Sequence, residues 1–137
     1  MAIETQKSVH EWCKATFTRH IGVKGRAVAL VEEAVELALA CGVDSKAIKS
    51  VVEVPIIKES IRLFNGERKW HDREDAEEVA DVLLCLYAYA EEAGYDAHKE
   101  LDEKMALNRT RSKEYYANKT AEKEDWGYIL PDAPQVK

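Results

Sequence analysis

The chain has few of the residues that interrupt helices or cross-link small folds. Its 137 residues include three prolines, six glycines and three cysteines. The apolar spacing between the scarce prolines and glycines is helical, so we expect no β-strand. Cys13, Cys41 and Cys85 have no CxxC spacing, which disfavours a zinc site or a disulfide framework. We expect buried free thiols in a reducing, cytoplasmic setting.

An excess of basic residues and a long apolar run are also missing. Lys and Arg together number 20, against 26 Asp and Glu, and the formal net charge of −6 disfavours nucleic-acid binding. The longest apolar stretch, Ala27 to Cys41, contains three glutamates, and it is shorter than the roughly 18–20 apolar residues that span a bilayer. Met1 to Lys7 lacks the apolar core of a signal peptide. We therefore expect one domain over residues 1–137, with neither a nucleic acid nor a membrane as partner.

Capping and stop signals divide the chain into helical segments. We expect helices at about Ser8–His20, Arg26–Cys41, Asp44–Pro55, Ile56–Phe64, Arg73–Glu92 and Asp96–Tyr116. The expected N-caps are Ser8, Asp72 and Asp96, and a turn lies between Gly22 and Gly25. The stops are Gly42, Asn65-Gly66 and Gly94, and Pro55 is expected to end or kink its helix. The tail from about Asn118, with Pro131 and Pro134, is expected to be irregular. The fold class is an all-α bundle of about four long helices with short helical connections.

Two apolar helical segments carry acids within their apolar stretches. Between Ala27 and Cys41 the only residues that are not apolar are Glu32, Glu33 and Glu36. Between Val79 and Ala90 the only ionised residue is Asp81, and Glu78 directly precedes that run. At about 100° per residue, the members of each group share one sector of their helix. The acids therefore form short patches on otherwise apolar helices.

If the two segments pack face to face, Glu33, Glu36, Glu78 and Asp81 converge where water is limited. Carboxylates removed from water need a cation, and a hard divalent ion such as Mg²⁺, or Mn²⁺ in its place, prefers oxygen ligands. The alternative is that both motifs are solvated surface. A di-iron carboxylate site is disfavoured, because none of the four histidines completes a Glu-x-x-His motif.

A basic stripe follows on the last expected helix. Lys104, Asn108 and Arg111 are spaced i, i+4 and i+7, which places them within about 60° of one another on a helical face. An ammonium, an amide and a guanidinium on one line suit polyphosphate oxygens. A merely solvated charged face is the alternative, since the same segment also contains Arg109 and Lys113.

Together these motifs resemble those of the MazG-like all-α nucleotide pyrophosphohydrolase superfamily. The family pattern EExxE, then ExxD, then KxxxNxxR is matched by Glu32 to Glu36, Glu78 to Asp81 and Lys104 to Arg111. The segment Glu11 to Phe17 is also similar to the start of the phage-type branch that acts on dATP and dGTP. The resemblance covers roughly residues 8–112. The connection over residues 37–77 is longer than is usual for the family. This extra segment could form a lid, a dimer contact or part of the base pocket, so it bears on the choice of substrate.

The resemblance implies hydrolysis of a nucleoside triphosphate to a monophosphate and pyrophosphate. By it, Glu33, Glu36, Glu78 and Asp81 would hold Mg²⁺, and Glu32 is the candidate general base. The expected substrate-binding residues are Lys104, Asn108, Arg111 and, through stacking on the base, Trp12 or Trp70. Packing in the core or in a loop is the alternative for both tryptophans.

Several functions stay open. Purine deoxynucleoside triphosphates are the first expected substrates, and dUTP or a phosphoribosyl nucleotide is the alternative. A nucleotide sensor without turnover and a purely structural bundle belong to different classes. Helices that are apolar on nearly all sides need cover that so short a chain cannot supply. We therefore expect a homodimer at least, and the resemblance allows a homotetramer.

Overall fold

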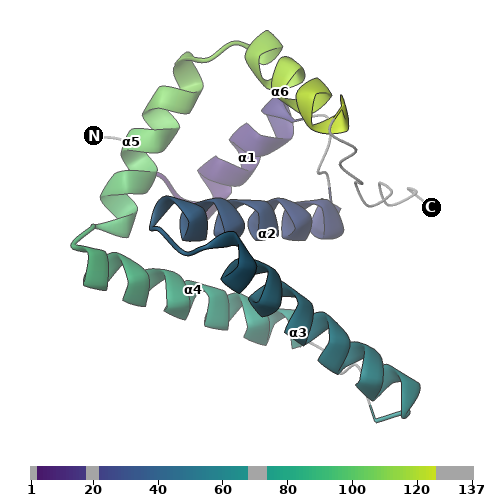
Figure 1. Ribbon diagram of the computed structural model, residues 1–137. Coiled ribbons are helices and arrows are strands. Elements are labelled where there is room, and N and C mark those ends of the chain that lie inside the picture. The colour runs from purple at the N-terminus through teal and green to yellow at the C-terminus, as the bar shows by residue number, and fades with distance from the viewer. Residues whose placement is uncertain (1–2, 18–21, 68–73, 126–137) are drawn as a thin grey trace. The chain divides into compact units, whose positions relative to one another are not determined.

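Six helices make up the described part of the chain in this computed structural model, which describes residues 3–17, 22–67 and 74–125 (Figure 1). They are α1 (Gln6–Thr16), α2 (Gly22–Ala40), α3 (Ser45–Phe64), α4 (Glu74–Ala93), α5 (Ala97–Thr110) and α6 (Lys113–Asp125). These residues contain no strand, which confirms the all-α class. The prediction of about four long helices with short helical connections was wrong in the number of helices. His20, Trp70, Asp72, Pro131 and Pro134 lie outside the described residues.

The chain forms two compact units. The terminal unit comprises Met1–Ala29 and Val82–Lys137, and the central unit comprises Leu30–Asp81. The central unit therefore holds the C-terminal half of α2, all of α3 and the first residues of α4. The terminal unit holds α1, α5, α6 and the remaining parts of α2 and α4.

Local hydrogen bonds explain where α1 begins. Thr5 is its N-cap and accepts a hydrogen bond from the backbone N–H of Ser8 at 3.1 Å. Ser8 returns the bond, since its Oγ accepts from the N–H of Thr5 at 2.8 Å. This reciprocal pair is a capping box. Ser8 is thus the third residue of the helix. The prediction from the sequence that Ser8 is the N-cap was wrong.

Glycine ends α2 where the sequence predicted. Gly42 has φ +94°, a conformation that side chains with a Cβ rarely adopt. Its N–H donates to the carbonyl of Leu39, and the N–H of Val43 donates to Ala38, both at 3.0 Å. This pair of bonds is a Schellman motif, which satisfies carbonyls left over at the helix end. The start of α2 was predicted too late, because the helix begins at Gly22 and Gly25 lies within it.

α3 is one helix, and its continuity past Pro55 corrects the prediction of two short ones (Figure 1). Asp44 begins it as predicted, accepting bonds from the N–H groups of Lys46 at 2.9 Å and Ala47 at 3.0 Å. Pro55 has no N–H for the carbonyl of Val51, four residues earlier. Val51 is 71% exposed, so water can bond that carbonyl, and the proline is tolerated inside the helix.

The last predicted helix is divided in two. Asp96 caps α5 as predicted, and the N–H of Lys99 is the main cause that holds the pKa of the Asp96 carboxyl below its ordinary value of 3.8. α5 then ends at Thr110, because Arg111 has an extended backbone with φ −83° and ψ 144°. Ser112 Oγ accepts from the N–H of Tyr115 at 3.1 Å, as an N-cap side chain does, and α6 follows. Residues 118–125 are helical, so the predicted irregular tail was wrong over that stretch.

The described residues bury very little apolar surface. Only Ala90 and Met105 count as buried apolar residues among them, and both belong to the terminal unit. Along α3, eight large apolar residues are exposed, up to Phe64 at 91%. α2 and α4 also expose valine and leucine side chains. No helix within the described ranges is both long and apolar enough to cross a membrane.

Replacement of Pro55 tests the account of α3. Pro55→Ala restores an N–H for the carbonyl of Val51, so we expect the free energy of unfolding to rise by about 2 kcal/mol. Urea denaturation followed by circular dichroism measures this change. Val54→Ala is the matched control, because it raises helix propensity next to Pro55 without adding a donor, and its gain should stay below about 1 kcal/mol. A lower urea midpoint for Pro55→Ala would contradict this account.

Candidate functional site

The five predicted acids all lie on helices of the central unit. α2 carries Glu32, Glu33 and Glu36, and the first turns of α4 carry Glu78 and Asp81. The spacings of three and four residues are therefore helical spacings, and the acids of each helix share a sector of it. Both acidic motifs belong to the same compact unit although about 40 residues of sequence separate them.

The described residues of the single chain do not gather these acids into a metal site. Glu33, Glu36, Glu78 and Asp81 are exposed, and Glu32 is half-buried. Within residues 3–17, 22–67 and 74–125, no group of three or more His, Cys, Asp or Glu side chains is placed to hold a metal ion. The donor set still suits Mg²⁺, because it consists of carboxylate oxygens alone. The expected exclusion of water from the acids therefore requires cover that the described part of one chain does not supply.

The predicted phosphate-binding stripe is only partly helical. Lys104 and Asn108 lie one turn apart on α5, whereas Arg111 follows the helix and has an extended backbone. The Nη1 of Arg111 nevertheless donates to Oδ1 of Asn108 at 3.2 Å, so these two side chains are in contact. Both are half-buried, and Lys104 is exposed. The helical backbone predicted for Arg111 was wrong, and the binding of phosphate by these residues stays a prediction.

An aromatic cluster in the terminal unit adjoins this stripe. The ring centroids of Trp12, Phe17 and Tyr116 lie 5.4 to 5.6 Å apart in edge-to-face pairs. Tyr115 packs on Tyr116 with a centroid distance of 5.0 Å. Edge-to-face rings at such distances stabilise beyond the area that they bury. Trp12 is therefore packed against other rings, and its stacking on a nucleotide base stays a prediction.

Cations lie on this cluster, and the sequence analysis missed three of its members. Arg26 Cζ lies 5.5 Å from the Phe17 centroid, and Arg111 Cζ lies 4.7 Å from that of Tyr115. Lys119 Nζ lies 5.6 Å from the same Tyr115 ring. The missed residues are Arg26, Tyr115 and Lys119. The spacing of Tyr115 and Lys119, four residues apart after a serine that can cap a helix, was the available signal.

Tyr116 connects the cluster to Asn108. Its Oη donates to the backbone carbonyl of Asn108 at 3.2 Å, across the turn between α5 and α6. The side chain of Asn108 meanwhile accepts from Arg111. Contacts to both the backbone and the side chain restrict the motion of Asn108. The cluster therefore orders two of the three residues that the sequence assigned to phosphate.

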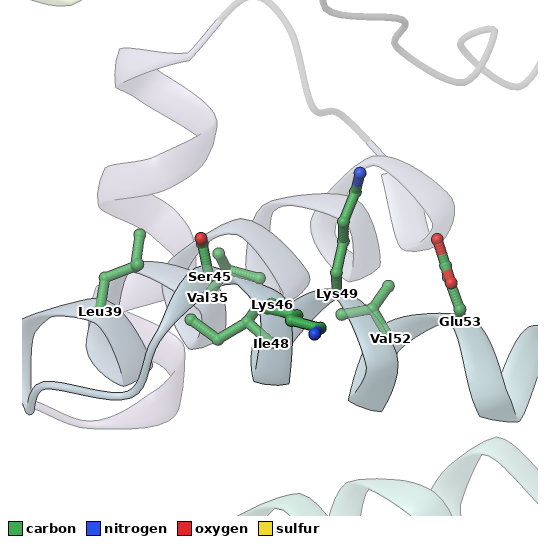
Figure 2. A pocket seen from close by; sticks show the side chains of 8 residues that line it. All are labelled: Val35, Leu39, Ser45, Lys46, Ile48, Lys49, Val52 and Glu53. Carbon is green, nitrogen blue, oxygen red and sulfur yellow. The ribbon is translucent and has the colours of Figure 1, made fainter.

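A groove in the central unit is distinct from both sets of residues. Its volume is about 710 Å³, and residues of α2 and α3 line it (Figure 2). The lining residues are Val35, Leu39, Ser45, Lys46, Ile48, Lys49, Val52 and Glu53. In Figure 2 the side chains of Lys49 and Glu53 extend from α3 toward the same side. None of the predicted site residues lines this groove, which lies largely within the long connection over residues 37–77.

All three cysteines are free thiols, but only Cys13 is partly buried. Burial raises the pKa of the Cys13 thiol above its ordinary value of 9.0, and the nearby Arg26 cation acts in the opposite direction. Cys41 and Cys85 are exposed, so the prediction of buried thiols was wrong for these two. Because the thiolate is the reactive form, Cys13 should be the slowest of the three to react.

Alkylation with N-ethylmaleimide at pH 8, followed by mass spectrometry, checks this order. We expect Cys41 to be modified well before Cys13 in the folded protein and at a similar rate in 8 M urea. Arg26→Ala removes the cation that favours the thiolate, so it should slow the modification of Cys13 further. Equal rates for Cys13 and Cys41 in the folded protein would show that the thiol is not shielded.

No protein-family model matches the chain, and neither the curated proteins nor the solved structures give a match. The resemblance to MazG-like proteins therefore rests on the three motifs and their spacing.

Proposed function

We propose that this protein is a Mg²⁺-dependent nucleoside triphosphate pyrophosphohydrolase that works in the cytoplasm, with Mn²⁺ as the alternative ion. One observation carries the proposal: two acidic motifs, far apart in sequence, both lie on helices of the same compact unit. The ordered pair of Asn108 and Arg111 supports it independently, because an amide and a guanidinium fit phosphate and sugar oxygens.

The acids divide into ligands and a base. Glu33 and Glu36 on α2 would hold Mg²⁺ together with Glu78 and Asp81 on α4. When bound, the ion neutralises phosphate charge and acidifies a water molecule. Glu32 is half-buried and lies at the edge of the acidic sector, where it can accept a proton from the attacking water. The bond between the α and β phosphates then breaks, and pyrophosphate leaves.

The basic stripe and Trp12 would bind the substrate. Lys104 and Arg111 contact phosphate oxygens, and Asn108 positions the sugar or a phosphate through its amide. Trp12 is the candidate for stacking on the base. Purine deoxynucleoside triphosphates are the first candidates, because the segment Glu11 to Phe17 resembles the branch that acts on dATP and dGTP. Hydrolysis of dUTP or of a phosphoribosyl nucleotide is the alternative within the same chemistry.

The active form would contain at least two copies of the chain, as a homodimer or a homotetramer. Large apolar side chains on α2, α3 and α4 are exposed in the single chain. Full burial of a valine, leucine, isoleucine or phenylalanine side chain stabilises by about 1.5–3 kcal/mol each, so association is favoured. A second copy would also shield the acids from water. The divalent ion would then compensate the negative charge of the buried carboxylates.

Pyrophosphate release from a panel of natural deoxy- and ribonucleoside triphosphates tests the activity. We expect Mg²⁺-dependent release, highest with dATP or dGTP, and a loss of about a hundredfold or more for Glu36→Gln and Asp81→Asn. Glu91→Gln is the matched control, because Glu91 is an exposed acid on α4 outside the motif and should leave the rate unchanged. No release from any triphosphate would refute the enzymatic proposal.

Measurements of nucleotide binding, product formation and stability separate the competing classes of function. A nucleotide sensor would bind triphosphate with the same Mg²⁺ dependence, but no product would form. A structural bundle would bind neither ion nor nucleotide, and Glu33→Leu would stabilise its association by extending the apolar surface of α2 that a second chain can cover.

Light scattering at micromolar concentration tests the oligomeric state. We expect a mass of at least two chains, and a shift toward smaller species for Ile57→Glu, because Ile57 is among the exposed apolar residues of α3. A mass of 15.5 kDa for the unmodified protein, that of one chain, would contradict the proposed assembly.

A further inference from the structure

We propose that Arg111 and Lys119, both held at the ring of Tyr115, form a two-cation subsite for the terminal phosphates of a polyphosphate. Its ligand class is pyrophosphate or the corresponding end of a triphosphate. The role of this subsite in turnover rests on the proposed function, whereas its binding of inorganic pyrophosphate does not.

The geometry places two positive charges at one aromatic ring. Arg111 Cζ lies 4.7 Å and Lys119 Nζ lies 5.6 Å from the Tyr115 centroid. Both distances are within the roughly 6 Å over which a ring attracts a cation. Tyr115 and Lys119 are one turn apart on α6, and Arg111 lies just before this helix. The ring thus brings together cations from two different segments.

Within the described part of the chain, no acid forms an ion pair with either of these two cations. The ion pairs formed by the described residues include neither Arg111 nor Lys119. Glu122 is three residues beyond Lys119 on α6, yet it is not paired with it. Arg109, only two residues before Arg111, shows the contrast, because it forms an ion pair with Glu4. Two like charges at one ring, neither of them paired with a described acid, favour the binding of an anion.

The subsite is also partly ordered before any ligand binds. Arg111 is half-buried and donates to Oδ1 of Asn108 at 3.2 Å, which leaves other N–H groups of its guanidinium for a ligand. Tyr116 fixes Asn108 through its backbone carbonyl. A fork of donors and a flexible ammonium suit two adjacent phosphoryl groups better than one. We therefore expect pyrophosphate to bind more tightly than orthophosphate.

Calorimetric titration of inorganic pyrophosphate into the full-length protein, without divalent metal, tests the subsite. Lys119→Ala should weaken binding about five- to tenfold, the effect of one lost charge-assisted contact at an exposed position. Lys113→Ala is the matched control, because it removes the same charge from the same helix without a contact to Tyr115, and it should bind like the unmodified protein.

Two substitutions of Tyr115 distinguish this role from a structural one. Tyr115→Phe keeps the ring and should keep the affinity, whereas Tyr115→Leu should weaken pyrophosphate binding about as much as Lys119→Ala. Thermal unfolding of each variant shows whether it is folded at the titration temperature. Equal affinity of Lys119→Ala and Lys113→Ala, or no binding to the unmodified protein, would overturn the proposal.

The test also separates the two proposals. If the protein binds pyrophosphate through Lys119 but releases none from triphosphates, the subsite stands and the hydrolase proposal fails. If the protein hydrolyses triphosphates and Lys119→Ala changes neither KM nor the affinity for pyrophosphate, the subsite fails and the hydrolase proposal stands.

Discussion

The large apolar side chains of α2, α3 and α4 gain stability only when they are removed from water. The carboxylates on α2 and α4 would then lose water as well, so they would need a compensating positive charge. A single chain meets neither condition, since those apolar side chains and four of the five acids are exposed. The proposed association of chains would satisfy the first, and the proposed divalent ion among the carboxylates would satisfy the second. The proposed oligomer and the proposed metal site are therefore linked, because burial of the acids makes the cation necessary.

In the described part of the terminal unit, several positive charges lie at aromatic rings and not at carboxylates. Three of its cations lie at aromatic rings, with Arg26 at Phe17 and both Arg111 and Lys119 at Tyr115. An aromatic ring attracts a cation without neutralising it, so such a residue keeps its charge for a ligand. A carboxylate partner would cancel much of that charge. This difference is what makes α6, which the sequence analysis overlooked, a candidate for phosphate binding.

Local signals in the sequence located several helix ends correctly. Asp44 and Asp96 cap helices, and Gly42 ends one, because each of these depends on only a few neighbouring residues. Two errors came from choosing one local signal over another. Thr5 and Ser8 are both hydroxyl residues, and only their reciprocal bonds show which one is the cap. Pro55 was expected to end or kink its helix and to separate it from a second short one, whereas α3 continues through it at an exposed position.

For the site, the sequence located both acidic motifs on helices and joined Asn108 to Arg111, but it could not assemble the rest. The convergence of the acids depends on how helices from one or more chains pack, which residue spacing does not encode. The Tyr115 subsite depends on the break at Arg111, and helical periodicity across residues 96–116 hid it.

Crystals grown with Mn²⁺ offer the most direct measurement, because anomalous scattering locates the ion without assumptions about the fold. The account predicts a peak at about 2.0–2.3 Å from carboxylate oxygens of Glu36 and Asp81, in a site closed by a second copy of the chain. Well-ordered crystals in which both carboxylates are solvated, with no Mn²⁺ between the two helices, would contradict it.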